Sequence, residues 1–262
     1  MISNAAARGR ILPAVNRILS WIPTIPFLLA FGLALVVFDV AGRIVRPFSL
    51  RGFEYVMAAL QRTLTSLFWI TGTRVHIERP ASIQPRTGYA VISNHQSLLD
   101  IAILGGTLFT NFPKYVAKKE LGKGIPSISL NLTRGGNALI DRDDRRQAIG
   151  AIRELARTAQ ERNVSVVIFP EGTRSRDGSL GEFKRAGALA LLREADQLPV
   201  VPMAIDGAWK MFRYNMLPVP FGTTVRVRFG DPVPRRADDG EAMLVYAERF
   251  IRATFEEWRT DA

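Results

Sequence analysis

Three apolar runs, none interrupted by a charge, constrain the fold more than any other feature of this sequence. They are Tyr89 to Ile92, Val164 to Phe169 and Val200 to Ile205. Such runs predict strands buried on both faces, because a strand with one face in water alternates apolar and polar side chains. Helical patterns stand between the runs. The sequence therefore predicts an α/β fold in which a mostly parallel, mixed sheet is flanked by helices on both faces.

Weaker patterns surround these runs. Apolar side chains recur at helical spacing in 144–162 and 241–258, which predicts two amphipathic helices. Arg74 to Glu78 and Val225 to Phe229 alternate instead, as half-exposed strands do. The arginines of the second of these strands indicate an edge position with a basic outer face.

The amino-terminal part of the chain is basic and then strongly apolar. Arg8, Arg10 and Arg17 precede a run from Trp21 to Val40, which has nearly the length needed to cross a bilayer although prolines and Asp39 interrupt its edges. No small-x-small cleavage site follows, so we do not expect a removed signal peptide. A spanning helix and a shallow insertion both stay open, because arginines flank the run on both sides.

A second apolar segment, Tyr55 to Ile70, has helical spacing and a single charge, Arg62. It fits a core helix as well as a helix that lies on a membrane. Two apolar segments joined by an arginine-rich turn favour a membrane-associated helical hairpin. We therefore expect residues 1–72 to form a basic segment and this hairpin, and residues 73–262 to form the α/β domain.

The stretch from Ser93 to Asp100 follows the first apolar run and carries the residues that we expect to do chemistry. His95 comes directly after the strand, and Asp100 lies five positions on. A neutral imidazole takes a proton from a hydroxyl, and a carboxylate on its other nitrogen fixes the tautomer and stabilises the imidazolium. The same stretch also fits a plain helix start in which Ser97 caps the helix and Asp100 lies in its first turn.

A polar loop, Pro170 to Gly178, follows the second apolar run without a break. Sites in α/β folds lie at the carboxyl ends of parallel strands. Gly172 permits close backbone approach, Thr173 offers a hydroxyl, and Arg174 offers a bidentate fork for a phosphate. A solvated turn is the alternative, which the unbroken polarity directly after a buried strand disfavours.

Charge restricts the partners of the chain, and its composition restricts its chemistry. Thirty-five Lys and Arg against 24 Asp and Glu give a net charge of +11, which suits nucleic acid, an anionic membrane or a phosphorylated substrate. No nucleic-acid-binding motif is present, so we expect no nucleic-acid partner. The absence of cysteine excludes disulfides and thiolate catalysis, and with only two histidines we expect no metal site.

Four blocks of sequence, taken in order, resemble the 1-acylglycerol-3-phosphate O-acyltransferases, the lysophosphatidic acid acyltransferase branch of the glycerolipid acyltransferases. The first is similar to the family's His-x4-Asp block, and the second to Gly-x-x-Phe-Ile-x-Arg with Leu139 in place of Phe. The third matches without a departure. The blocks are Asn94 to Asp100, Gly136 to Arg142, Phe169 to Ser175 and Val200 to Ile205. Ordered matches to several blocks are far more specific than a lone motif.

This resemblance implies that an acyl group passes from a thioester to the free hydroxyl of a lysophosphatidic acid, without a covalent acyl-enzyme. His95 would be the general base on that hydroxyl, and Asp100 would orient it. Arg174 would carry the acceptor phosphate, on a loop shaped by Glu171 and Gly172. The residues that would add positive charge are Arg142, Lys118 and Lys119.

The resemblance also implies partners and a location. The expected substrates are lysophosphatidic acid and an acyl thioester, either acyl-CoA or acyl carrier protein, with no cofactor. The product would be phosphatidic acid for phospholipid biosynthesis, made at the cytoplasmic face of a bacterial inner membrane. Two alternatives stay open. One is an acyltransferase of the same fold with another acceptor: a lyso-ornithine lipid, glycerol 3-phosphate or another lysophospholipid. The other is a non-enzymatic basic module that binds membrane surfaces.

Overall fold

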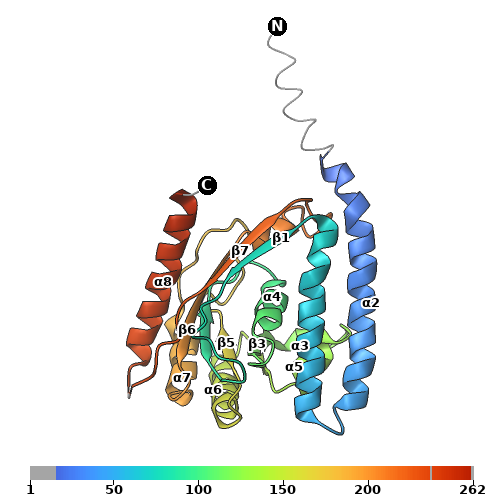
Figure 1. The fold of residues 1–262 in the computed structure, drawn as a ribbon. Coiled ribbons are helices and arrows are strands. Elements are labelled where there is room, and N and C mark those ends of the chain that lie inside the picture. The colour runs from blue at the N-terminus through green and yellow to red at the C-terminus, as the bar shows by residue number, and fades with distance from the viewer. Residues whose placement is uncertain (1–15, 237, 261–262) are drawn as a thin grey trace.

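A sheet of seven strands forms the centre of the protein, which the computed structural model describes over residues 16–236 and 238–260 (Figure 1). In chain order the strands are β1 (Arg74–Glu78), β2 (Ala90–Ser93), β3 (Lys114–Lys118), β4 (Ala138–Ile140), β5 (Val166–Ile168), β6 (Val200–Asp206) and β7 (Thr224–Phe229). They lie in the order β1-β7-β6-β2-β5-β3-β4. All neighbours are parallel except β6 and β7. The prediction of a mixed, mostly parallel sheet is confirmed.

Helices cover both faces of this sheet (Figure 1). The helices are α2 (Trp21–Val45), α3 (Leu50–Ser66), α4 (Asp100–Thr107), α5 (Ile128–Arg134), α6 (Arg145–Glu161), α7 (Arg185–Glu194) and α8 (Gly240–Thr260), with 3₁₀ turns η1 (Leu67–Thr71), η2 (Lys119–Gly122) and η3 (Ala208–Phe212). On β2, Ala90 and Ile92 belong to the core shared with α6, α7 and α8, whereas Val91 belongs to the core shared with α4. A strand buried on both faces needs apolar side chains at every position, which is why these runs do not alternate.

The two predicted amphipathic helices are present. Asp144 caps α6 by accepting a hydrogen bond from the backbone N–H of Gln147 at 2.9 Å, and Leu155 is buried against the sheet. In α8, Leu244 and Ile251 are buried in the same core. Burying each such side chain contributes about 1.5–3 kcal/mol, so the apolar faces hold both helices on the sheet.

The prediction that β7 is an edge strand is wrong. β7 lies between β1 and β6, and β1 is the edge strand on which His76 is exposed. The guanidinium of Arg228 bonds to Glu78 of β1 and, at 2.6 and 2.9 Å, to Glu257 of α8. It also lies over the ring of Trp258. Acids from two distant segments therefore neutralise an arginine that local sequence reasoning places in solvent.

The segment that the sequence left open between a core helix and a membrane-lying helix is a core helix. α3 runs alongside α2 and packs on α4 (Figure 1). Its apolar side chains Phe53, Met57, Leu60 and Leu64 are buried there. The buried face of α3 is the one that the core-helix alternative predicts, whereas Trp69 in η1, within the same predicted segment, is 73% exposed.

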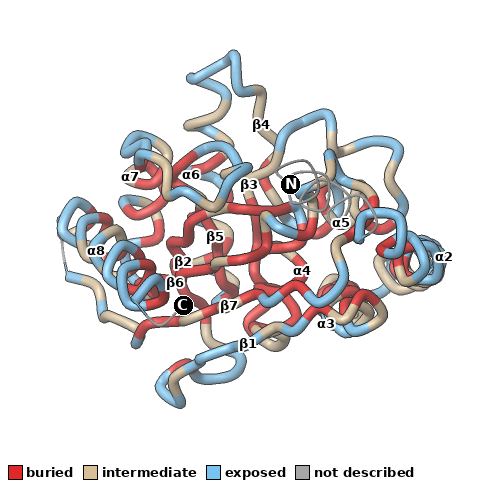
Figure 2. The backbone as a smooth tube through the Cα atoms, turned by 90° about the horizontal axis from the view of Figure 1, so that it is seen from above, coloured by how far each residue is buried: buried red, intermediate tan, exposed pale blue. Residues whose placement is uncertain are grey.

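α2 has a buried inner face and an exposed apolar outer face. Thr24, Phe27 and Leu35 pack inward. The outer apolar residues, each more than half exposed, form what we call the apolar stripe, which begins just before α2: Ile18, Leu19, Ile22, Ile25, Leu29, Leu33, Val36, Val37, Val40 and Ile44. Figure 2 shows the exposed side of α2 opposite the buried central strands. By length and composition, the helix from Asn16 to Val45 suffices to cross a membrane, with a mean hydropathy of 2.2. Arg8 and Arg10 lie outside the described residues.

Polar bonds fasten α2 to the rest of the fold along its length. Near its start, the hydroxyl of Thr24 accepts a hydrogen bond from the backbone N–H of Val219 at 3.0 Å. Further along, Ser127 donates from its N–H to Asp39 (2.7 Å) and from its hydroxyl to the carbonyl of Leu35 (2.6 Å). α2 is thus bonded to segments that lie some 90 and 195 residues away in sequence.

A buried ion pair fastens α3 to the sheet in the same way. The ammonium of Lys114 lies 2.5 Å from Glu54, and Arg162 bonds the same carboxylate oxygen at 2.8 Å. Burial lowers the pKa of Lys114, while the nearby Glu54 opposes that shift. Contacts therefore cross the boundary expected at residues 72 and 73, and the division into two domains stays a prediction.

Candidate active site

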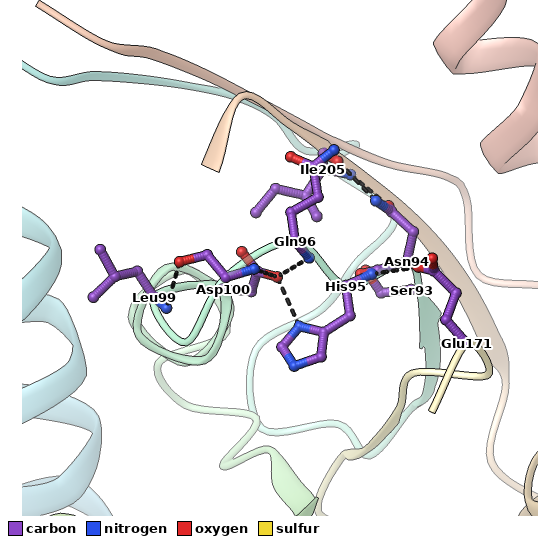
Figure 3. Close-up of polar contacts among 9 residues, drawn as sticks. Ser93, Asn94, His95, Gln96, Leu99, Asp100, Glu171 and Ile205 are labelled. Carbon is purple, nitrogen blue, oxygen red and sulfur yellow. Dashed lines mark hydrogen bonds and ion pairs between the residues drawn. The ribbon is translucent and has the colours of Figure 1, made fainter. Parts of the chain in front are cut away.

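The turn between β2 and α4 carries the histidine and the carboxylate singled out from the sequence (Figure 3). Nδ1 of His95 lies 2.8 Å from Oδ2 of Asp100. The same oxygen accepts hydrogen bonds from the backbone N–H groups of Gln96 (2.7 Å) and Ser97 (2.9 Å). The Asp100 side chain is fully buried, whereas that of His95 is 16% exposed. A fixed, buried carboxylate thus holds one ring nitrogen, and within the described residues Nε2 makes no hydrogen bond.

The helix-start interpretation of this turn is only partly right. α4 begins after Leu99, so Ser97 is not its N-cap, although the Ser97 hydroxyl accepts a hydrogen bond from the Leu99 N–H at 3.1 Å. Asp100 lies in the first turn of α4, as expected. Its carboxylate folds back onto the preceding loop, so the local turn chemistry positions the acid for His95 and does not compete with it.

Three side chains that were not predicted as part of the site fix this turn. The ring of Phe169 stacks on the His95 imidazole, with centroids 4.1 Å apart and planes inclined by 15°. Asn94 forms two hydrogen bonds of 2.9 Å with the backbone of Ile205 in β6. The amide of Gln96 donates to Asp206 at 3.0 Å. Asn94 and Gln96 flank His95 in the sequence, and Phe169 directly precedes the polar loop, so their positions could have marked them as candidates. The residues that they contact lie in distant parts of the chain, which the sequence does not reveal.

Glu171 connects the histidine to the polar loop that follows β5. Its Oε1 accepts a hydrogen bond from the His95 N–H at 2.7 Å, and its Oε2 accepts one from the Gly181 N–H at 2.8 Å. The N–H of Ser175 donates in turn to the carbonyl of His95 at 2.8 Å. Burial raises the pKa of Glu171, and these backbone bonds oppose the shift. Arg174 is therefore held beside the histidine turn, because the adjacent Ser175 is hydrogen-bonded to His95.

The loop is ordered by its own contacts as well. Gly172 has a φ of +67°, in the left-handed region that favours glycine. The Asp177 carboxylate accepts hydrogen bonds from the hydroxyls of Ser179 and Ser175, which lower its pKa to about 2. The loop borders a depression of about 390 Å³ whose lining includes Thr173 and Arg174. Most residues of the loop are nevertheless exposed, so the solvated-turn alternative stays open for this segment.

Three predicted cations lie on the same sheet edge but are not brought into contact with the histidine. Lys118 is the last residue of β3, Lys119 follows it, and Arg142 follows β4, with β5 between these strands and β2. Lys119 pairs with Asp141. Among the residues with described side chains, neither Lys118 nor Arg142 bonds to His95 or to the polar loop.

The arrangement is suited to removing a proton from a group held near the loop that bears Arg174. The His95 imidazole has one nitrogen held by a carboxylate and the other open, which is the geometry of a general base. Over residues 16–236 and 238–260 we find no group of three or more His, Asp or Glu residues that would hold a metal ion. The chemistry that these side chains support is therefore acid–base chemistry on a bound hydroxyl.

The family model and the relatives that match this chain are all described as acyltransferases. The family model described as Acyltransferase matches residues 74–206. The 1-acyl-sn-glycerol-3-phosphate acyltransferase of Cocos nucifera is 34% identical over 178 residues, which are 67% of this chain and 54% of that protein. The alpha form of Homo sapiens is 32% identical over 212 residues, 78% of this chain and 72% of that one. The enzyme of Helicobacter pylori is 35% identical over 157 residues, 60% of this chain and 63% of that protein.

A solved structure has the same fold. The crystal structure of the 1-acyl-sn-glycerophosphate (LPA) acyltransferase PlsC from Thermotoga maritima superposes with a TM-score of 0.73 at 23% identity, covering 93% of this chain and 98% of that one. The match to Cocos nucifera, in contrast, spans little more than half of the plant protein. Architecture is therefore shared across nearly the whole chain, and sequence similarity is concentrated where the histidine turn and the polar loop lie.

Proposed function

Because the chain belongs to the acyltransferase family, we propose that it transfers a fatty acyl group from an acyl thioester to the free hydroxyl of 1-acylglycerol 3-phosphate, which yields phosphatidic acid. One observation carries the proposal: a His95–Asp100 pair at 2.8 Å, with the backbone of His95 bonded directly to the loop that bears Arg174. The names of the relatives support the choice of acceptor.

In the proposed reaction, Nε2 of His95 removes the proton from the acceptor hydroxyl as the oxygen attacks the thioester carbonyl. A carbon–oxygen bond forms, the carbon–sulfur bond breaks, and the leaving thiolate takes the proton back from the imidazolium. Asp100 stabilises the imidazolium through Nδ1. A general base of this kind contributes about 10²–10⁴ in rate, so substrate positioning supplies the remainder.

The polar loop would hold the acceptor by its phosphate. The Arg174 guanidinium would provide the bidentate contact, with the Thr173 hydroxyl and the exposed backbone at Gly172 beside it. Glu171 would keep this loop at a fixed distance from His95 through its two backbone bonds. Lys118, Lys119 and Arg142 would attract anions along the same sheet edge without touching the phosphate.

We also propose that α2 lies in the plane of a membrane leaflet, at its cytoplasmic face, and does not cross the bilayer. The apolar stripe runs along the whole outer face of α2, while the inner face is bonded to the domain near both ends. A spanning α2 would draw the polar surfaces of the domain into lipid, which costs several kcal/mol per unsatisfied group. An acceptor that resides in the leaflet would then meet the active site at the headgroup level.

Turnover by the purified protein tests the proposal. The wild type should acylate 1-acylglycerol 3-phosphate in vesicles with an acyl-CoA or acyl carrier protein thioester as donor. Parallel assays with lyso-ornithine lipid and glycerol 3-phosphate show which acceptor the protein uses. His95→Ala should abolish turnover while leaving the fold and vesicle binding intact, and Arg174→Ala should lose most activity with phosphorylated acceptors. Folded wild type without turnover on any acceptor would favour the non-enzymatic membrane-binding alternative.

A further inference from the structure

A lysine outside the polar loop lies across it. Lys184 immediately precedes α7, and its backbone N–H donates to the carbonyl of Pro170 at 2.8 Å, at the start of the loop. Its side chain runs over Gly172: a Cβ built on that glycine would lie 3.4 Å from both Cδ and Nζ of Lys184. The ammonium therefore lies next to the loop, on a residue that is exposed to solvent.

Lys184 lines the same depression as Arg174 and Arg176. Within the described part of the chain, none of these three cations has a carboxylate partner at ion-pair distance. The neighbouring Arg185 differs, because it pairs with Glu241 of α8. The lining of this depression thus holds three cations that form no ion pair with a described residue, together with three carboxylates, Glu171, Asp177 and Glu182.

The acids that share this lining are mostly committed elsewhere. Glu171 holds two backbone N–H groups, and Asp177 holds the hydroxyls and the N–H of its own turn. The third acid, Glu182, is exposed and, among the residues that the structure describes, bonded to none of the cations. The lining carries no net positive charge, but its three cations form no ion pair within the described ranges and can contact an anionic ligand.

We infer that Lys184 is a second ligand of the acceptor phosphate, in addition to Arg174, and that it sets the preference of the enzyme for a phosphate monoester over uncharged acceptors. This inference rests on the proposed function. A phosphate monoester carries a charge of about −1.5 to −2 at pH 7, so a single guanidinium leaves it incompletely neutralised. A side chain at position 172 would be in ordinary contact with the Lys184 side chain, and the φ of +67° there favours glycine.

The test compares Lys184→Met with Arg185→Met. Methionine keeps the apolar stem and removes the charge, and the two variants remove equal charge from adjacent residues. For Lys184→Met we expect kcat/KM with 1-acylglycerol 3-phosphate to fall about 10- to 100-fold, the size of one charged hydrogen bond, mostly through KM. The rate with a monoacylglycerol should not change. Arg185→Met should resemble the wild type with both acceptors, and Lys184→Arg should retain the preference.

A binding measurement keeps this test separate from the proposed function. In titration calorimetry, glycerol 3-phosphate should bind Lys184→Met at least about 10-fold more weakly than the wild type and should bind Arg185→Met as tightly as the wild type. This result is expected whether or not acyl transfer is observed. An equal loss with both acceptors would make Lys184 a structural support of the loop and overturn the inference. Unchanged glycerol 3-phosphate binding in Lys184→Met would also overturn it, even if wild-type acyl transfer is confirmed.

Discussion

Replacing Asp100 by asparagine separates the charge of this side chain from its shape. In the structure one carboxylate oxygen accepts three hydrogen bonds of 2.7–2.9 Å, from His95, Gln96 and Ser97. The other oxygen is buried without a hydrogen-bond partner. An asparagine oxygen fits the first position, and its amide group then occupies the second. The turn should therefore keep its geometry while the imidazolium loses its counter-charge.

The expected loss follows from the role of that charge. General-base catalysis by a correctly oriented imidazole provides about 10²–10⁴ in rate, or about 2.7–5.5 kcal/mol at 1.36 kcal/mol per tenfold, and we expect Asp100→Asn to lose most of it in kcat. The fold should lose less, about 1–3 kcal/mol, because three charge-assisted bonds become neutral ones and an amide is left buried without an acceptor.

The assay is steady-state acyl transfer with saturating donor, run beside thermal melts of each variant. Asp206→Asn is the matched control, because Asp206 bonds the same turn through Gln96 at 3.0 Å but does not touch the imidazole. This control should lose less than about tenfold in kcat. If folded Asp100→Asn kept more than a tenth of the wild-type kcat, the catalytic role of the pair would be refuted. An equal loss in both variants would assign the effect to loop geometry.

Two further predictions concern the membrane and the pH. Leu29→Asp with Leu33→Asp places two charges on the apolar stripe, where the native side chains are 70% and 65% exposed, and vesicle co-sedimentation should fall at least about tenfold. Val245→Asp on α8 is the control, and unaltered sedimentation of the stripe variant would remove α2 as the anchor. Burial raises the pKa of Glu171 above 4.5, so the folded state holds this proton more tightly than the unfolded state, and the stability it contributes falls as the pH rises through the raised pKa. Glu171→Gln should therefore cost more unfolding free energy at pH 4 than at pH 7, and melts that show the cost growing with pH would contradict this reasoning.

Interactions between near neighbours in the chain were predictable. The apolar runs identify β2, β5 and β6, because a strand that is buried on both faces has apolar side chains at nearly every position. The His95–Asp100 contact joins residues five apart within one turn, so spacing and residue type were sufficient to propose it. The roles of these residues in acyl transfer remain proposals for the variants above to test.

Interactions between distant segments were not predictable in the same way. β7 appears as an edge strand because its arginines have no local partner, and the acids that pair with Arg228 come from β1 and α8. Lys119 pairs with Asp141 because β3 and β4 are adjacent in the sheet. Phe169 reaches the His95 ring only because β5 pairs with β2.

The chain's own pattern was thus sufficient for the architecture and the candidate base, because hydrophobic burial and turn chemistry act on each residue and its near neighbours. Only the tertiary structure shows that the loop with Arg174 lies against the histidine turn, that α3 packs in the core and that one face of α2 is exposed. Those outcomes depend on which strands pair and which charges meet across the sheet, and such contacts join residues separated by 60 to 195 positions in the chain.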